Sequence, residues 1–175
     1  MRDSVPRPTR RRLALGALGL PLLSLAGPGW ALQSPAGAVV LSIGGRVGKP
    51  NREGRALFDM DMLAALPQRS ITQKTPWYPG PRKFTGPLLR DVLEAAGALG
   101  QSIEAIALND YKVTIPMDDV RQHDVLLALL LDERPMPVRD KGPLFIVYPF
   151  DSDARLRNSI YYSRSAWQLK ALEIR

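Results

Sequence analysis

The sequence predicts an α+β fold. Short apolar runs typical of strands alternate with short segments of helical spacing, and none of the helical segments is long. This order favours α+β over a doubly wound parallel sheet. Among the 175 residues, 45% are hydrophobic and 23% charged, as in ordinary globular domains. The length corresponds to one domain, which we place at residues 32–175 after a leader at residues 1–31.

The first elements of the domain follow from β-rich and capping residues. Val39–Ile43 is β-branched and apolar, and it ends at two glycines, so we expect a strand there. Asp59 is placed to cap a short helix over residues 60–66, which Pro67 closes.

The next segment combines a strand, an irregular stretch and a helix. Residues 69–75 alternate as a strand does, whereas three prolines within residues 76–81 lack amide donors and predict irregular structure. Apolar residues at helical spacing predict a helix over residues 87–96. Pro87 suits its first turn and Gly97 suits its end.

The second half of the domain begins with an expected hairpin. Residues 103–108 and 111–115 are its strands, and Asn109-Asp110 is its turn, because both residue types tolerate left-handed conformations. Pro116, followed by two aspartates, opens a short helix. We expect buried strands at residues 125–131 and 144–148, and a last strand at residues 167–174.

The leader predicts export from the cytoplasm. It carries five arginines and one aspartate, a net of +4 out of the chain's +7, before an apolar run of about fourteen residues. Small residues at Gly29 and Ala31 match a signal peptidase site, so we place cleavage after Ala31. The run is shorter than the roughly 20 residues of a membrane span. Arg10-Arg11-Arg12 also resembles a twin-arginine signal, so the export route stays open. We expect the mature protein in a bacterial periplasm.

The composition excludes several kinds of chemistry. The chain has no cysteine and one histidine, His123, which excludes thiolate metal sites, iron–sulfur clusters, cysteine nucleophiles and multi-histidine cages. His123 fits a surface position or a helix end. No nucleophile turn or phosphate loop is present. The mature domain's small charge excess does not indicate a nucleic-acid partner.

Three segments are candidates for a binding site. In the first, Thr75 and Trp77 lie in a proline-rich stretch with Tyr78 beside two cations. Such a stretch can form one wall of a site for a flat ring, where stacking contributes about 0.5–1.5 kcal/mol beyond burial. The alternative is that Trp77 plugs the edge of the core.

The second candidate is the loop that holds Arg139, Lys141 and Gly142. It can present backbone donors and two cations to an oxygen-rich or phosphorylated group. The alternative is a solvated turn.

The third candidate is the turn Asn109-Asp110-Tyr111. A carboxylate or amide there can pair with a guanidine-like edge, and Tyr111 can stack on a ring. The alternative is that Asp110 only makes the turn.

Together these segments resemble a known family, the small stand-alone members of the molybdopterin-binding fold of sulfite oxidase. The resemblance covers nearly all of residues 38–175 and implies an α+β fold with a mixed β-sheet. The segments that carry it, in order, are Thr75–Trp77, Phe84–Leu93, Ala107–Tyr111, Arg139–Leu144 and Tyr148-Pro149.

The chain departs from that family at the metal. The resemblance implies a molybdenum-ligating cysteine shortly before the segment that begins at Phe84, and the equivalent stretch, Ile71–Thr75, contains no sulfur. Threonine is a hard ligand and a poor replacement for a thiolate. We therefore expect a pterin, reduced or molybdopterin-like, without molybdenum, and we do not expect redox catalysis.

This combination is similar to the periplasmic pterin-binding regulators of bacterial signalling. The resemblance implies that the protein binds a reduced pterin and contacts the periplasmic domain of a membrane-bound enzyme that makes or degrades cyclic di-GMP. Two alternatives stay open: a molybdopterin-dependent oxidoreductase or its subunit, and an adaptor without a small ligand. The expected ligand-binding residues are Thr75, Trp77, Asn109, Asp110, Tyr111, Arg139, Lys141 and Gly142.

Overall fold

The computed structural model describes residues 32–175, so the expected leader and its cleavage point lie outside the described residues. A five-stranded sheet has the strand order β2-β1-β11-β5-β6. Its β1–β11 pair is parallel and its other pairs are antiparallel, which makes it mixed. The strands are β1 (Val39–Gly45), β2 (Ala56–Asp59), β5 (Ser102–Ala107), β6 (Lys112–Pro116) and β11 (Leu169–Ile174).

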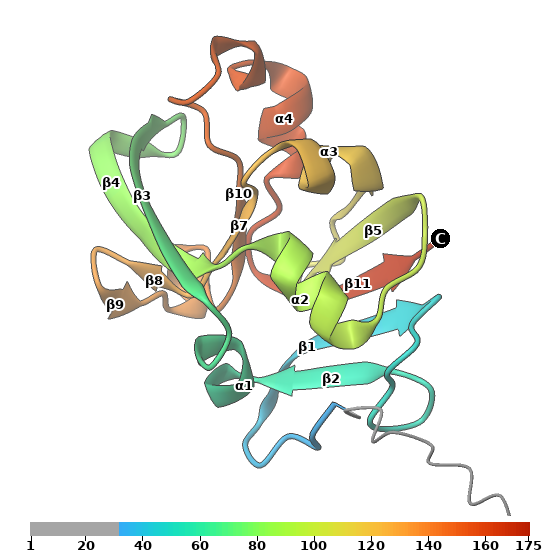
Figure 1. The fold of residues 1–175 in the computed structure, drawn as a ribbon. Coiled ribbons are helices and arrows are strands. Elements are labelled where there is room, and N and C mark those ends of the chain that lie inside the picture. The colour runs from blue at the N-terminus through green and yellow to red at the C-terminus, as the bar shows by residue number, and fades with distance from the viewer. Residues whose placement is uncertain (1–31) are drawn as a thin grey trace, which may run out of the picture.

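Two smaller sheets stand beside the five-stranded one (Figure 1). The four-stranded sheet consists of β3 (Gln68–Thr75), β4 (Tyr78–Pro87), β8 (Leu130–Leu131) and β9 (Arg134–Pro135). The two-stranded sheet pairs β10 (Phe145–Val147) with β7 (Leu126–Ala128). The mixed sheet and the short helices confirm the predicted α+β fold.

The helices are short and connect or cover the sheets. They are α1 (Met60–Ala64), α2 (Leu89–Ala96), α3 (Met117–Gln122) and α4 (Ser159–Arg164), with single 3₁₀ turns η1 (Val138–Asp140) and η2 (Ala154–Leu156). None of the helices within residues 32–175 has the length and apolar character needed to cross a membrane.

The core has two parts. The larger cluster lies between the five-stranded sheet and helices α2 and α3, where Leu41 and Ile43 meet Leu89 and Val92. The smaller cluster lies between β4, β7 and β10 and includes Phe84. Trp77 packs against both clusters, so the segment after β3 is held where the sheets meet.

Asp59 caps α1 as predicted and also holds the segment before β1. Its carboxylate accepts hydrogen bonds from the amides of Met62 at 2.9 Å and of Ala36 and Gly37 at 2.8 Å. These backbone donors, with that of Gly37 first, lower the pKa of Asp59 below its usual value. The Asp59 carboxylate therefore holds both the start of α1 and the segment before β1 in place.

The proline-rich stretch is not irregular as predicted, because β4 already begins at Tyr78 and contains Pro79 and Pro81. Here β4 pairs only with β3, since β8 joins it at Phe84 and Thr85. Prolines are tolerated where a strand has one open edge. The prediction failed because it treated missing donors as excluding a strand altogether.

Several other boundaries also differ from the predictions. Pro87 ends β4 instead of opening α2, which begins at Leu89, while Gly97 ends that helix with φ of 65° as expected. The apolar run at residues 125–131 is divided between β7 and β8, which belong to different sheets. Strand β11 begins at Leu169 instead of residue 167.

Candidate functional site

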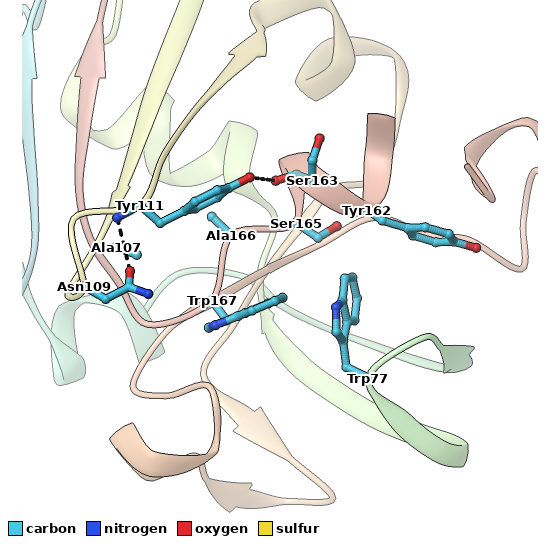
Figure 2. Close-up of a pocket in the computed structure, with 9 residues that line it drawn as sticks. All are labelled: Trp77, Ala107, Asn109, Tyr111, Tyr162, Ser163, Ser165, Ala166 and Trp167. Carbon is cyan, nitrogen blue, oxygen red and sulfur yellow. Dashed lines mark hydrogen bonds between the residues drawn. The ribbon is translucent and has the colours of Figure 1, made fainter. Parts of the chain in front are cut away.

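A pocket of about 220 Å³ opens between the end of the β5–β6 hairpin, Trp77 and the segment that follows α4 (Figure 2). We call it the aromatic pocket. Its lining residues are Trp77, Ala107, Asn109, Tyr111, Tyr162, Ser163, Ser165, Ala166 and Trp167.

Two indole rings and two phenol rings are part of the pocket wall. Trp77 meets Trp167 edge to face, with ring centroids 5.7 Å apart, and meets Tyr162 at 6.0 Å. Trp167 is 36% exposed and Tyr111 is 44% exposed, so both retain surface toward solvent. Aromatic faces of this kind stack on planar, electron-rich rings. The pocket is therefore suited to a flat heterocycle.

Helix α4 supplies one side of the pocket and is held both by polar contacts and by the packing of Tyr161 and Tyr162 on the core. Asn158 caps its start by accepting hydrogen bonds from the amides of Ile160 and Tyr161. None of its residues is fully buried. At its end, Arg164 donates to Asp119 at 2.8 Å, and the Tyr111 hydroxyl donates to the carbonyl of Ser163 at 3.0 Å. The pocket shape thus depends on these ties.

The structure brings three of the predicted site residues together: Trp77, Asn109 and Tyr111 all line the aromatic pocket. The Asn109 side-chain oxygen accepts from the amide of Tyr111 at 3.1 Å. Its amide nitrogen donates to no group among residues 32–175, so it remains able to bind a ligand. Trp77 combines the two expected roles, since it lines the pocket and packs on the core.

Thr75 lines a neighbouring pocket instead of the aromatic one. Its hydroxyl oxygen is buried and has no hydrogen-bond partner among the described residues. Buried polar atoms are normally paired, so this hydroxyl marks a place where a bound molecule or water belongs.

Asp110 does not line the aromatic pocket. It is exposed, and its carboxylate bonds to the Lys170 ammonium at 2.7 Å. This hydrogen bond and the positive charge lower the pKa of Asp110. Its φ of 63° is the left-handed conformation that the hairpin turn requires. The placement favours the turn-making alternative over the predicted pairing with a ligand.

The loop that holds Arg139, Lys141 and Gly142 lies outside the pocket lining. Lys141 places its ammonium 5.7 Å from the ring centroid of Trp167, so the loop adjoins the pocket through that indole. The Gly142 amide already donates to the carbonyl of Pro137 at 3.0 Å, which leaves no donor there for a ligand. Arg139 is exposed and forms no ion pair within residues 32–175.

The sequence prediction missed the part of the pocket that comes from α4 and the residues after it, Tyr162, Ser163, Ser165 and Ala166. The prediction places Trp167 in the last strand, whereas the residue precedes β11 and lines the pocket. One signal pointed to this helix: Asn158 is a favourable N-cap and precedes a run that contains two tyrosines.

The residues of this site offer ring faces and an amide but no thiolate that could bind molybdenum. Residues 32–175 contain no group of three or more histidine, aspartate or glutamate side chains placed to hold a metal ion, and the whole chain lacks cysteine. Near the end of β3 the oxygen available is the unpaired hydroxyl of Thr75, which is not a thiolate. The aromatic pocket, by contrast, offers ring faces and an amide.

Fold and site together define an α+β domain with an aromatic pocket whose shape suits a flat ring. Residues 38–152 match the model of the oxidoreductase molybdopterin binding domain, and the chain belongs to that family. The matched part includes Trp77, Asn109 and Tyr111, whereas α4 and Trp167 follow its end. No curated protein matches the chain.

Proposed function

We propose that this protein is a periplasmic pterin-binding sensor that regulates a membrane-bound enzyme of cyclic di-GMP synthesis or degradation, without catalysis of its own. One observation carries the proposal. A molybdopterin-binding domain whose chain contains no cysteine has an aromatic pocket lined by Trp77, Tyr111 and Trp167. The groups for an organic ring are present while the thiolate for the metal is missing.

The size and lining of the pocket support a pterin ring as ligand. A volume of about 220 Å³ lies below the roughly 300–1,000 Å³ of sites that enclose larger ligands. A bicyclic ring is a suitable occupant. Its face stacks on Trp167 or Tyr111, and its carbonyl accepts from the free amide of Asn109. The lining of the pocket contains no histidine, aspartate, glutamate or lysine, so binding is the activity we assign.

The mouth of the pocket supports a protein partner. Large apolar side chains are exposed at Tyr111 and Trp167, and at Leu108 and Val138 beside them. The adjoining Arg139 and Lys141 form no ion pairs within residues 32–175. Exposed apolar surface rimmed by charge is typical of interaction sites. A partner with an acidic rim, here the periplasmic domain of the signalling enzyme, would cover the pocket and sense its occupancy.

Fluorescence gives a direct test of ligand binding. Protein that begins at residue 32 contains two tryptophans, Trp77 and Trp167, and both line the aromatic pocket. Titration with a reduced pterin should quench its emission and raise its Tm. No quenching and no Tm change at high micromolar pterin would reject the proposal.

Two further measurements separate the alternatives. Metal analysis of protein made in a molybdenum-cofactor-competent host should find no stoichiometric molybdenum, and one molybdenum per chain would favour the oxidoreductase. Binding to the periplasmic domain of a cyclic di-GMP enzyme should depend on pterin. If the protein bound this partner equally well with and without pterin, the result would favour an adaptor that needs no small ligand.

A further inference from the structure

Strand β3 lies at the edge of the four-stranded sheet and pairs with β4 alone (Figure 1). Prolines of β4 stand opposite both Gln68 and Lys74 in this antiparallel pair. Because proline has no amide proton, these two positions cannot exchange a pair of backbone hydrogen bonds with β4. Bonded and non-bonded positions alternate along such a ladder, so Ser70 and Thr72 also direct their backbone N–H and C=O groups away from β4.

The hydrogen bonds of β4 agree with this alternation. Thr85 and Lys83 stand opposite Ser70 and Thr72, and their carbonyls point the other way, accepting at 2.8 Å from the amides just before and just after β8. On the β3 side, the backbone groups of Ser70 and Thr72 form no hydrogen bond outside the strand pairing among residues 32–175. Both residues are exposed. We call residues 68–72 the open edge.

Other strand edges of the domain are blocked. The Asn51 side chain covers the edge of β2, since it donates to the carbonyl of Leu57 and accepts from its amide, each at 2.8 Å. Two prolines remove donors from the first half of β4, and β9 has only two residues. On β3 itself, Asp151 accepts from the Lys74 amide at 3.3 Å. Proteins usually block edges in such ways, because unpaired strands bind other chains. Residues 68–72 lack this protection.

The two strands beside the open edge carry only positive charge. Residues 68–87 contain four basic side chains and no carboxylate. Arg82 and Lys83 are paired with two carboxylates of the β8–β9 turn. Arg69 and Lys74 are exposed and form no ion pair within residues 32–175, and Asp151 is already paired with an arginine of its own loop. A second copy of the chain would bring like charges together, whereas an acidic strand would be attracted.

We propose that the open edge of β3 binds an extended acidic segment of a partner protein by strand addition. The added strand bonds to the outward backbone groups of Ser70 and Thr72. Arg69 and Lys74 lie five positions apart and on opposite faces of β3, so the bound segment carries carboxylates at both ends with the same spacing. None of these residues lines the aromatic pocket, so the inference does not rest on pterin binding.

NMR titration of the isotope-labelled protein with two synthetic peptides tests this surface. The probe is Asp-Val-Thr-Val-Thr-Asp, and its matched control is Lys-Val-Thr-Val-Thr-Lys. We expect the aspartate peptide to shift the amide signals of Ser70 and Thr72 and to bind about fivefold more tightly than the lysine peptide. The absence of shifts at these amides with millimolar peptide would overturn the site. Equal affinity of the two peptides would overturn the acidic partner.

A third peptide tests the backbone pairing on the unaltered protein. Methylation of the backbone amides of the aspartate peptide removes the donors of the new ladder, so we expect its binding to be lost. Binding that survives methylation would overturn strand addition. In the protein, Thr72→Pro removes an outward donor that the fold does not use, and we expect an unchanged Tm with loss of peptide binding. A folded Thr72→Pro that bound the peptide as the parent does would also overturn strand addition.

Charge variants and the oligomeric state complete the test. Arg69→Gln should weaken binding of the aspartate peptide about threefold. Arg52→Gln is the matched control, because Arg52 is an exposed cation without an ion pair in the described chain and lies on the β1–β2 connection. Equal affinity of these two variants would overturn the role of Arg69. Sedimentation should find a monomer, and a dimer that Thr72→Pro dissociates would show that a second copy occupies the open edge instead.

Discussion

The hydroxyl of Tyr148 donates a 2.7 Å hydrogen bond to Oδ2 of Asp119, and both side chains are buried. Arg164, the last residue of α4, donates to the same oxygen at 2.8 Å. Burial, followed by the Asp119 hydrogen bond and charge, raises the pKa of Tyr148. The tyrosine therefore stays protonated and remains a donor, and the core is joined to the helix that lines the aromatic pocket.

Arg164→Met should destabilise the protein by about 2 kcal/mol, because it leaves the buried Asp119 carboxylate without its cation. Urea unfolding followed by circular dichroism measures the change. Arg121→Met is the matched control, since Arg121 pairs with Asp118 at the surface and exposed pairs contribute at most about 1 kcal/mol. Equal effects of the two substitutions would contradict the role given to Arg164.

Trp167→Ala should lower pterin affinity by about tenfold, which corresponds to a stacking contribution near the upper end of about 0.5–1.5 kcal/mol. Its partial exposure makes it a cleaner test than Trp77, which packs on both core clusters and whose loss would also cost stability. Trp77→Phe keeps most of that packing and should reduce affinity less. Titration with a reduced pterin measures the affinity of each variant, and its Tm shows whether it is folded. Unchanged affinity in Trp167→Ala would show that this indole does not contact the ligand.

Asn109→Ala should weaken pterin binding by about fivefold, since it removes the free amide of the pocket, a contact of about 1 kcal/mol. Asp110→Asn should change affinity by less than about twofold. Asparagine keeps the left-handed turn conformation, and the carboxylate that it replaces bonds to Lys170 outside the pocket. The same titration compares both variants, and a larger loss in Asp110→Asn would restore Asp110 to the binding site.

Gly142→Ala should destabilise the protein by about 1–3 kcal/mol, because a Cβ there would come within 1.9 Å of the Met136 carbonyl oxygen. The backbone must shift, and it carries Lys141 and the contact to Trp167 with it. Gly37→Ala is the control, since its added carbon would meet Asp59 at an ordinary 3.5 Å. Chemical denaturation measures the free energy of unfolding of both variants. An unchanged value for Gly142→Ala would show that the loop can shift without a loss of stability.

Acid should destabilise the protein partly through Asp59. Its folded pKa lies below the ordinary 3.8, so its charge stabilises the fold above that value, and this contribution is lost as the pH falls through the folded pKa. Asp59→Asn keeps a capping side chain but removes the titration. We expect the Tm of the parent protein to fall more steeply than that of the variant below about pH 4. If the Tm of the two proteins fell equally with pH, titration of Asp59 would not contribute to the acid destabilisation.

The sequence predicted the fold class, most strands and the Asp59 cap, because each depends on local spacing or on a single capping side chain. It failed where tertiary context decided the outcome. Pro79 and Pro81 fit into β4 because that stretch has one open edge, and the run at residues 125–131 divides because its halves pair with different sheets.

The site shows the same division. Trp77, Asn109 and Tyr111 were predicted as chemically suited residues and do share a pocket. An aspartate at position 110 was equally suited to bind a ligand. Its carboxylate instead bonds to Lys170, which lies sixty positions further along the chain. The contribution of α4 depends on Arg164 reaching Asp119, a contact between distant residues that no local pattern contains.

Strand β11 is the central strand of the five-stranded sheet, with β1 on one side and β5 on the other. Before it is in place, the β1–β2 and β5–β6 pairs are separate ribbons, and isolated two-stranded hairpins are marginal in water. During synthesis the sheet therefore cannot close until residues 169–174 have left the ribosome. Folding of this domain is expected to be a late, all-at-once event, and a nascent chain stalled before β11 should remain sensitive to proteases.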